Sequence, residues 1–178
     1  GYAWDDQSQS HLTPTFAVIG GYRLLNRMPP KPDQLSEFVR THHPSRLKKL
    51  EQEQREFTYQ QVQSLAWLGA DASEFEAVIR GWEKPLAYFR QYEQHGHPVF
   101  KSELAAFMCR ELLRMPLTAL KPHFVEYLAA RRRTNGSFNN TPADEGGDGH
   151  VVNTGWGLRA LAVLGRMEEF KEASCAWL

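Results

Sequence analysis

The chain has 178 residues, of which 42% are hydrophobic, and its 21 basic residues balance 21 acidic ones. This even balance gives no sign of a nucleic-acid-binding surface, and no stretch is apolar for long enough to predict a membrane span. The two cysteines, Cys109 and Cys175, lie inside apolar helical patterns and imply no disulfide framework. The composition therefore predicts a globular domain with a buried core and leaves its cellular compartment open.

A repeat of about 44 residues runs along the chain. Four apolar stretches each open with a small hydroxyl residue, which we call the anchor, and the spacings between successive anchors are 43, 44 and 52 residues: Thr15, Thr58, Ser102 and Thr154. In each stretch further apolar residues follow at offsets of 4, 7 and 10, which is the spacing of a helix and not of a strand. The sequence therefore predicts four helices of one kind, which we call the anchor helices.

Start signals accompany three of these helices. Thr13 followed by Pro14 is typical of an N-cap with proline in the first turn. The stretch Thr58–Gln61 fits a capping box, and Asn153 or Thr154 can cap the last helix.

Stop signals and second helices complete four predicted hairpins. Gly69 and Gly165 are placed as C-cap glycines, and Met28-Pro29 and Met115-Pro116 end the other two anchor helices. More charged helices are expected to follow, at Asp33–His42 continuing as Ser45–Phe57, at Ser73–Gln94, at Leu117–Arg133 and at Met167–Leu178. The basic run Arg131–Arg133 is expected to be a solvated helix end.

The expected fold class is all-α, because no segment alternates as a strand does. One hairpin cannot bury its apolar face alone, so hairpins stack, either in an open solenoid or in a ring. We expect a single repeat domain with repeats at roughly 1–44, 45–88, 89–133 and 134–178. Both ends of the sequence lie within a repeat pattern, which suggests a piece of a longer chain with further repeats.

Two segments carry a family resemblance. Asn135–Phe138, a loop rich in acids and glycine, and then the helix Thr154–Gly165 resemble the prenyltransferase and squalene-cyclase repeat. The segment Gly1–Leu25 resembles a second copy. The resemblance implies an α/α toroid, here an incomplete ring, that binds an apolar or mixed ligand such as an isoprenoid in its central cavity.

The catalytic motifs of that family are absent at the matching positions. Protein prenyltransferases hold zinc with an Asp-x-Cys before the anchor helix, where this chain has His150 and Val152, or His11 and Thr13 in the first repeat. Triterpene cyclases carry Asp-x-Asp-Asp-Thr, where this chain has His150-Val-Val-Asn-Thr. We therefore predict no metal and no cofactor, and we leave open whether the domain is catalytic.

The repeat gathers polar residues at one rim, because all anchor helices run in one direction. His11 and His150 lie four residues before their anchors, each after a pair of acids. Histidine titrates near neutral pH, so His150, His11 and Asp148 are the candidate catalytic residues. The candidate ligand-binding residues are Trp156, Asp144, Arg133, Asp6 and His97. Alternatively, the repeated Asp/His pattern is a structural signature that holds one hairpin to the next.

The long loop of the fourth repeat and the tryptophan that follows it mark the candidate site more closely. The loop Thr134–Asn153 is expected to be a lid or a substrate edge, because long structureless loops in compact domains are often functional. Trp156 is expected to line a cavity, since Gly155 and Gly157 leave room for a ligand beside its indole.

Two further functions remain open. One is a carbohydrate-active toroid, similar to a polysaccharide lyase or a glycosidase, in which the rim histidines and acids act on a sugar chain. The other is a non-catalytic repeat scaffold that binds a protein on its concave face. A closed cavity lined by Trp and Phe favours an isoprenoid ligand, an open groove with Arg, His and Asp favours a polysaccharide, and a flat arc favours a scaffold.

Overall fold

The computed structural model describes the chain except for residues 6, 43–50, 83–99, 170–171 and 173–178, and of residues 51–53 it describes the backbone alone. The regular structure of the described residues is helical, which confirms the all-α class. The α-helices are α1 (Leu12–Leu24), α2 (Pro32–Thr41), α3 (Glu51–Leu68), α4 (Glu76–Arg80), α6 (Phe100–Leu112), α7 (Lys121–Arg131) and α8 (Val151–Leu164). Short 3-10 turns occupy Ser73–Phe75, Ala143–Glu145 and Met167–Glu169.

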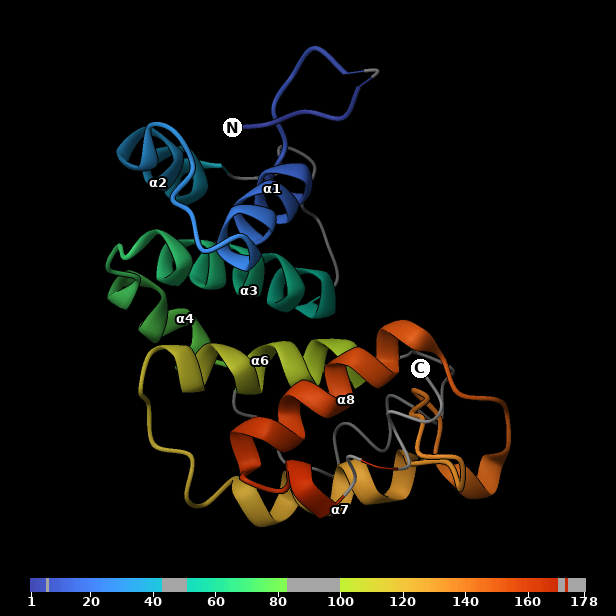
Figure 1. Cartoon of the computed structure of the whole chain (residues 1–178). Coiled ribbons are helices and arrows are strands. Elements are labelled where there is room, and N and C mark those ends of the chain that lie inside the picture. Colours follow the sequence, from blue (N-terminus) through green and yellow to red (C-terminus); the bar gives the residue numbers. More distant parts are fainter. Residues whose placement is uncertain (6, 43–50, 83–99, 170–171, 173–178) are drawn as a thin grey trace. The chain divides into compact units, whose positions relative to one another are not determined.

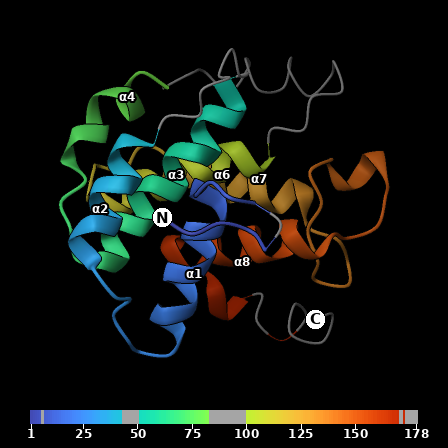
Figure 2. The same ribbon diagram turned by 90° about the horizontal axis from the view of Figure 1, so that it is seen from above.

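The chain divides into two compact units, Gly1–Gly81 and Trp82–Leu178. In the first unit α1 and α2 both pack against α3, as Figures 1 and 2 show. The ring of Phe16 on α1 stacks on Trp67 of α3 with 5.1 Å between centroids, and Gly20 lies against the same indole. Apolar side chains from all three helices form the buried core of this unit, among them Ile19, Leu35, Val39, Val62 and Leu65.

In the second unit α8 packs against α6 and α7, which Figure 1 shows side by side with it. Aromatic rings dominate this core. Phe107 on α6 meets Phe124 on α7 at 4.3 Å between centroids, and Phe100 stacks on Tyr127 at 5.9 Å. The single 178-residue domain that the repeat implies stays a prediction.

The four anchor helices end in the same way. Each is followed by a residue with left-handed backbone, at Asn26, Gly69, Arg114 and Gly165. That residue donates its N–H to the carbonyl three residues back, at 3.0 to 3.2 Å, and the next residue donates to the carbonyl five residues back, at 2.8 to 2.9 Å. This is the Schellman motif, and it satisfies carbonyls that the end of a helix leaves free. It falls 11, 11, 12 and 11 residues after the anchors.

These ends recur at the spacing of the anchors, and both predicted C-cap glycines are confirmed. The other two predicted ends are wrong by a few residues, since α1 stops at Leu24 and α6 at Leu112, well before Met28-Pro29 and Met115-Pro116. The prolines do not end the helices, because the left-handed turns at Asn26 and Arg114 have already done so.

The predicted starts are wrong at three helices. His11 and His150 are the N-cap residues of α1 and α8, so Thr13, Asn153 and Thr154 lie inside the first turns. α3 runs unbroken from Glu51 to Leu68, which places Thr58 in mid-helix and removes the capping box. The residues before Thr58 are mostly Glu, Gln and Arg, which favour a helix and contain no breaker.

The second helices agree with the sequence in part. The predicted continuation Ser45–Phe57 is wrong from residue 51 on, because those residues belong to α3, and residues 45–50 lie outside the described residues. α2 coincides with the predicted Asp33–His42, and α7 covers most of Leu117–Arg133. In the predicted Ser73–Gln94 a 3-10 turn leads into α4, which ends before Gly81, and residues 83–94 lie outside the described residues. Of Met167–Leu178, the 3-10 turn Met167–Glu169 and the helical residue 172 are described.

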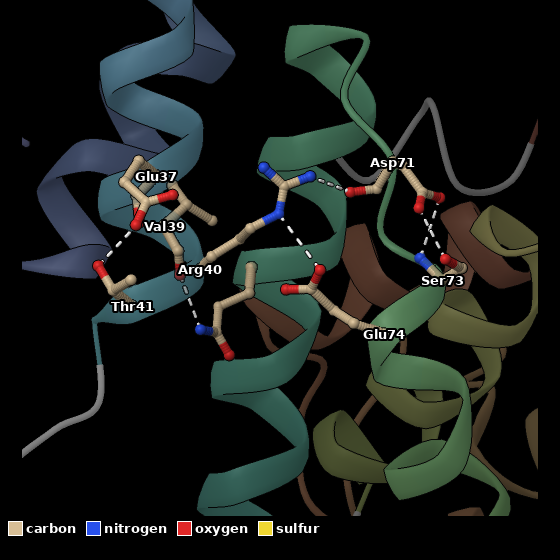
Figure 3. A network of polar contacts seen from close by, with 8 residues as sticks. Glu37, Val39, Arg40, Thr41, Asp71, Ser73 and Glu74 are labelled. Carbon is tan, nitrogen blue, oxygen red and sulfur yellow. Dashed lines mark hydrogen bonds and ion pairs between the residues drawn. The ribbon is translucent and has the colours of Figure 1, made fainter.

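A polar network holds α2 to α3 and to the segment that follows α3 (Figure 3). Arg40 pairs with Glu74 at 3.3 Å and donates to the carbonyl of Asp71 at 2.5 Å. Hydrogen bonds from the hydroxyl and the N–H of Ser73 lower the pKa of the Asp71 carboxyl. On the other side the buried amide of Gln61 donates to the carbonyl of Val39 at 2.8 Å. The network thus ties α2 to α3 and to the segment after it.

Candidate functional site

The segment that leads into α8 is attached to the helix through Thr154. The main-chain N–H of Phe138 donates to the hydroxyl oxygen of Thr154 at 3.0 Å, and that hydroxyl donates to the carbonyl of His150 at 3.0 Å. The N–H of His150 in turn donates to the carbonyl of Phe138 at 2.9 Å. Thr154 is fully buried. We call this closed set of hydrogen bonds the threonine clip.

The segment that leads into α1 forms the same clip in the first unit. Thr15 accepts from the N–H of Tyr2 at 2.8 Å and donates to the carbonyl of His11 at 2.7 Å. The N–H of His11 donates to the carbonyl of Tyr2 at 2.9 Å. The pattern of an aromatic residue, a histidine and a threonine therefore serves main-chain pairing in both places. The bonds of both clips involve the main chain of the histidine and the hydroxyl of the threonine, so the interpretation of the Asp/His pattern as a structural signature stays a prediction.

Phe138, the aromatic residue of the clip at Thr154, packs against the surface of α8. The ring of Phe138 lies so close to Gly157 that a Cβ there would meet it at 2.7 Å. Gly157 is thus small in order to admit Phe138, and the expectation that it opens Trp156 to a ligand is wrong. A Cβ at Gly155 would meet nothing within 4 Å, so Gly155 alone leaves open space beside the half-buried Trp156.

Arg133 organises the loop between α7 and α8. Its five N–H groups donate to the carbonyls of Arg131, Thr141, Gly146 and Gly147 and to the hydroxyl of Thr141, at 2.7 to 3.2 Å. A guanidinium has five N–H donors, so this set uses the whole group. Arg133, predicted to bind a ligand, instead holds the loop in place. These hydrogen bonds tether the loop to the end of α7, and its role as a lid or a substrate edge stays a prediction.

Three further predicted residues of the second unit are exposed. His150 stands at the N-terminus of α8, and Asp144 and Asp148 lie on the tethered loop before it. The carbonyl of Asp148 accepts a hydrogen bond from the side-chain amide of Asn139 at 2.5 Å, which ties the end of the loop to its start. The structure thus brings His150 and the two acids onto one ordered edge.

The predicted residues of the first unit are less completely described. His11 is half-buried, and its ring meets His42 edge-on at 6.4 Å. His42 in turn contacts the rings of Phe38 and Phe57, at 4.8 and 6.2 Å. The imidazole of His11 therefore adjoins an aromatic cluster. Two further predicted ligand-binding residues, Asp6 and His97, lie outside the described residues.

The basic run Arg131–Arg133 is not a solvated helix end. Arg131 is 4% exposed, its guanidinium lies 3.6 Å from the ring centroid of Tyr127, and its Nε donates to the carbonyl of Asn140 at 3.2 Å. A cation over an aromatic face is stabilised by the ring quadrupole and keeps its hydrogen bonds. Two of the three arginines thus build this part of the unit.

The described part of the chain contains neither a group of side chains suited to a metal ion nor a helix suited to span a membrane. No three or more His, Cys, Asp or Glu side chains gather there in a way that could hold a metal ion. Nor does any helix there have the length and apolar character needed to cross a bilayer. Burial raises the pKa of the Cys109 thiol, which makes it a poor nucleophile.

Two anchor helices leave apolar side chains uncovered. α1 and α8 carry one charged residue each, Arg23 and Arg159, so they are apolar on nearly every side. A helix of this kind is normally buried all round. Here, however, Val151 and Val152 of α8 are 60% and 47% exposed. At the end of α1 and just after it, the exposed large apolar residues are Leu24, Leu25 and Met28. The helical spacing of apolar residues does not single out these side chains, although the near-absence of charge along both helices indicates them.

A scan against protein-family models found no match to this chain, and searches of curated proteins and of solved structures found none either.

Proposed function

We propose that this chain is part of an α/α toroid of the prenyltransferase and squalene-cyclase kind, and that it binds an apolar or mixed ligand against its anchor helices. The proposal is supported by four anchor helices with the same ending and by the two threonine clips. Recurrence of the same local structure at repeat spacing is consistent with a tandem repeat of helical hairpins.

The observation that carries the ligand proposal is the uncovered apolar face of α8. Val151, Val152 and Gly155 are exposed on this helix, and Trp156 is half-buried beside them. Uncovered aliphatic and indole surface gains free energy when an apolar ligand displaces water from it, at about 25 cal/mol per Å². The exposed His150 at the N-terminus of the same helix offers a polar contact for one end of a mixed ligand.

The test is calorimetric titration of the chain with a long-chain isoprenoid alcohol. Val152→Glu places a carboxylate on the proposed binding face, and we expect it to weaken binding about tenfold or more. Val78→Glu is the matched control, because Val78 on α4 is 45% exposed and Val152 is 47% exposed. Absence of binding by the unaltered chain, or equal loss in both variants, would overturn the proposal.

A carbohydrate ligand is the second candidate, and the ordered edge of His150, Asp144 and Asp148 favours it. Exposed imidazole and carboxylate groups on a fixed edge can accept and donate hydrogen bonds to sugar hydroxyls. An acidic oligosaccharide or a neutral one, titrated in the same way, should then lose affinity with His150→Ala and keep it with Val152→Glu. The opposite pattern favours the apolar ligand.

A further inference from the structure

The turn after α7 places an asparagine and a glycine at the tip of a short hairpin. The N–H of Arg133 donates to the carbonyl of Ser137 at 2.8 Å, and the N–H of Gly136 donates back to the carbonyl of Arg133 at 2.9 Å. Gly136 has φ of 86°, which favours glycine there. The strand-like pairing continues in the bridge between Arg132 and Phe138.

The side chain of Asn135 is folded back along this turn. Its Oδ1 accepts hydrogen bonds from the N–H of Ser137 at 3.1 Å and from the hydroxyl of Ser137 at 2.6 Å. This is an Asx turn, which brings the side-chain amide carbon toward the chain that follows it. Asn135 itself is exposed, whereas Ser137 is fully buried and so holds its position.

We propose that Asn135 is a site of spontaneous deamidation, assisted by Ser137. The main-chain nitrogen of Gly136 attacks Cγ of Asn135, the new N–Cγ bond closes a five-membered succinimide, and the Cγ–Nδ2 bond breaks. The proton lost from the Gly136 nitrogen leaves with the side-chain nitrogen as ammonia. Water then adds to either carbonyl of the succinimide and opens it to aspartate or to isoaspartate.

Two features of the turn favour this reaction. The two donors of Ser137 face the oxygen on which negative charge develops during the attack, which is the arrangement of an oxyanion hole. Gly136 has no side chain to obstruct ring closure. Gly136 is buried and its N–H donates to the carbonyl of Arg133, so the turn must open locally before the nitrogen can attack.

The neighbouring asparagines provide an internal comparison. The amide of Asn139 is committed on both sides, since Nδ2 donates to the Asp148 carbonyl and Oδ1 accepts from the N–H of Asn140. Asn139 and Asn140 are each followed by a residue with a side chain, which hinders ring closure. The loop therefore holds one asparagine suited to the reaction and two that are not.

The isoaspartate product would disturb the candidate site. It adds one main-chain carbon inside a turn of three residues, so the pairing of Arg133 with Ser137 cannot keep its register. Phe138, which follows Ser137, belongs to the threonine clip at Thr154. Arg133 holds the acidic loop. The chemical change at Asn135 is thus coupled to the segment that leads into α8.

The experiment follows the folded 178-residue chain during incubation in mildly alkaline buffer, with peptide mapping by mass spectrometry. In heavy-oxygen water, product formed during the incubation carries the label, and isoaspartate within that product marks the route through the succinimide. We expect product at Asn135 to exceed product at Asn139 and Asn140, by a larger ratio in the folded chain than in denaturant. Ser137→Ala should slow the folded reaction about fivefold, the factor that one hydrogen bond provides, and should change the rate little in denaturant.

Labelled aspartate without isoaspartate, no excess of product at Asn135, or equal folded rates with and without the Ser137 hydroxyl would overturn the proposal. The folded-to-denatured ratio needs no variant, so it decides the matter even where Ser137→Ala fails to fold. Hydrogen exchange gives a second reading on the isolated isoaspartate product. There the amides of Phe138 and His150 should exchange faster than in the unmodified chain.

Discussion

Removal of the Thr154 hydroxyl tests the threonine clip most directly. Thr154→Val keeps the shape of the side chain and deletes one oxygen that both accepts from Phe138 and donates to His150. The carbonyl of His150 keeps a partner, because it also accepts the N–H of Thr154 at 2.8 Å. The buried N–H of Phe138 is left without its acceptor, and an unsatisfied buried donor costs about 1 to 3 kcal/mol.

We therefore expect Thr154→Val to lower the free energy of unfolding by about 2 kcal/mol. With a urea slope of about 2 kcal/mol per molar, the unfolding midpoint should fall by about 1 M. Far-UV circular dichroism during urea unfolding measures this midpoint. The near-UV signal is a second probe, because a chain with two compact units can unfold in two steps.

Thr13→Val is the matched control for this substitution. Thr13 also lies in the first turn of an anchor helix, but it is exposed, and its hydroxyl reaches Gln60 at the surface at 3.2 Å. Its midpoint should change by less than about 0.3 M, because exposed substitutions cost at most about 0.5 kcal/mol. Equal shifts in the two variants would refute the clip as a stabilising element.

Two further predictions concern backbone and packing. Gly157→Ala should destabilise the chain by about 1 to 3 kcal/mol, because its Cβ meets the ring of Phe138, whereas Gly155→Ala in the same helix should stabilise it by about 0.5 to 1 kcal/mol. Urea unfolding distinguishes them, and a destabilised Gly155→Ala would contradict the open space beside it. Arg114→Gly should raise stability by about 1 kcal/mol, because Arg114 has φ of 54° in the Schellman turn after α6; a lower melting temperature would show that its side chain matters more than its backbone.

The sequence by itself determined the helical class, the four anchor helices and two of their endings. The reason is physical, since apolar spacing at 3.6 residues and a glycine with left-handed backbone act within one or two turns of the chain. These signals depend little on what packs against the helix. The recurrence of the anchors at Thr15, Thr58, Ser102 and Thr154 is visible for the same reason.

Helix starts could not be found in this way. A threonine before an apolar stretch predicts an N-cap, as at Thr13 and Thr154, yet the N-caps are His11 and His150. Thr15 and Thr154 lie four residues beyond them and bond to a segment 13 or 16 residues earlier. The sequence shows that such a hydroxyl needs a partner, but only tertiary structure decides which partner it finds. At Thr58 the chain continues as helix, and the same residue type serves no clip.

The roles of Arg133 and Gly157 were likewise decided by the tertiary structure. A basic run and a small residue beside a tryptophan suggest ligand contacts, because both are common at binding sites. In the folded chain the guanidinium of Arg133 meets loop carbonyls, and Gly157 receives the ring of Phe138. Each of these contacts joins residues that are far apart along the loop between α7 and α8. Local residue spacing does not encode how that loop folds, so the sequence could not predict these contacts.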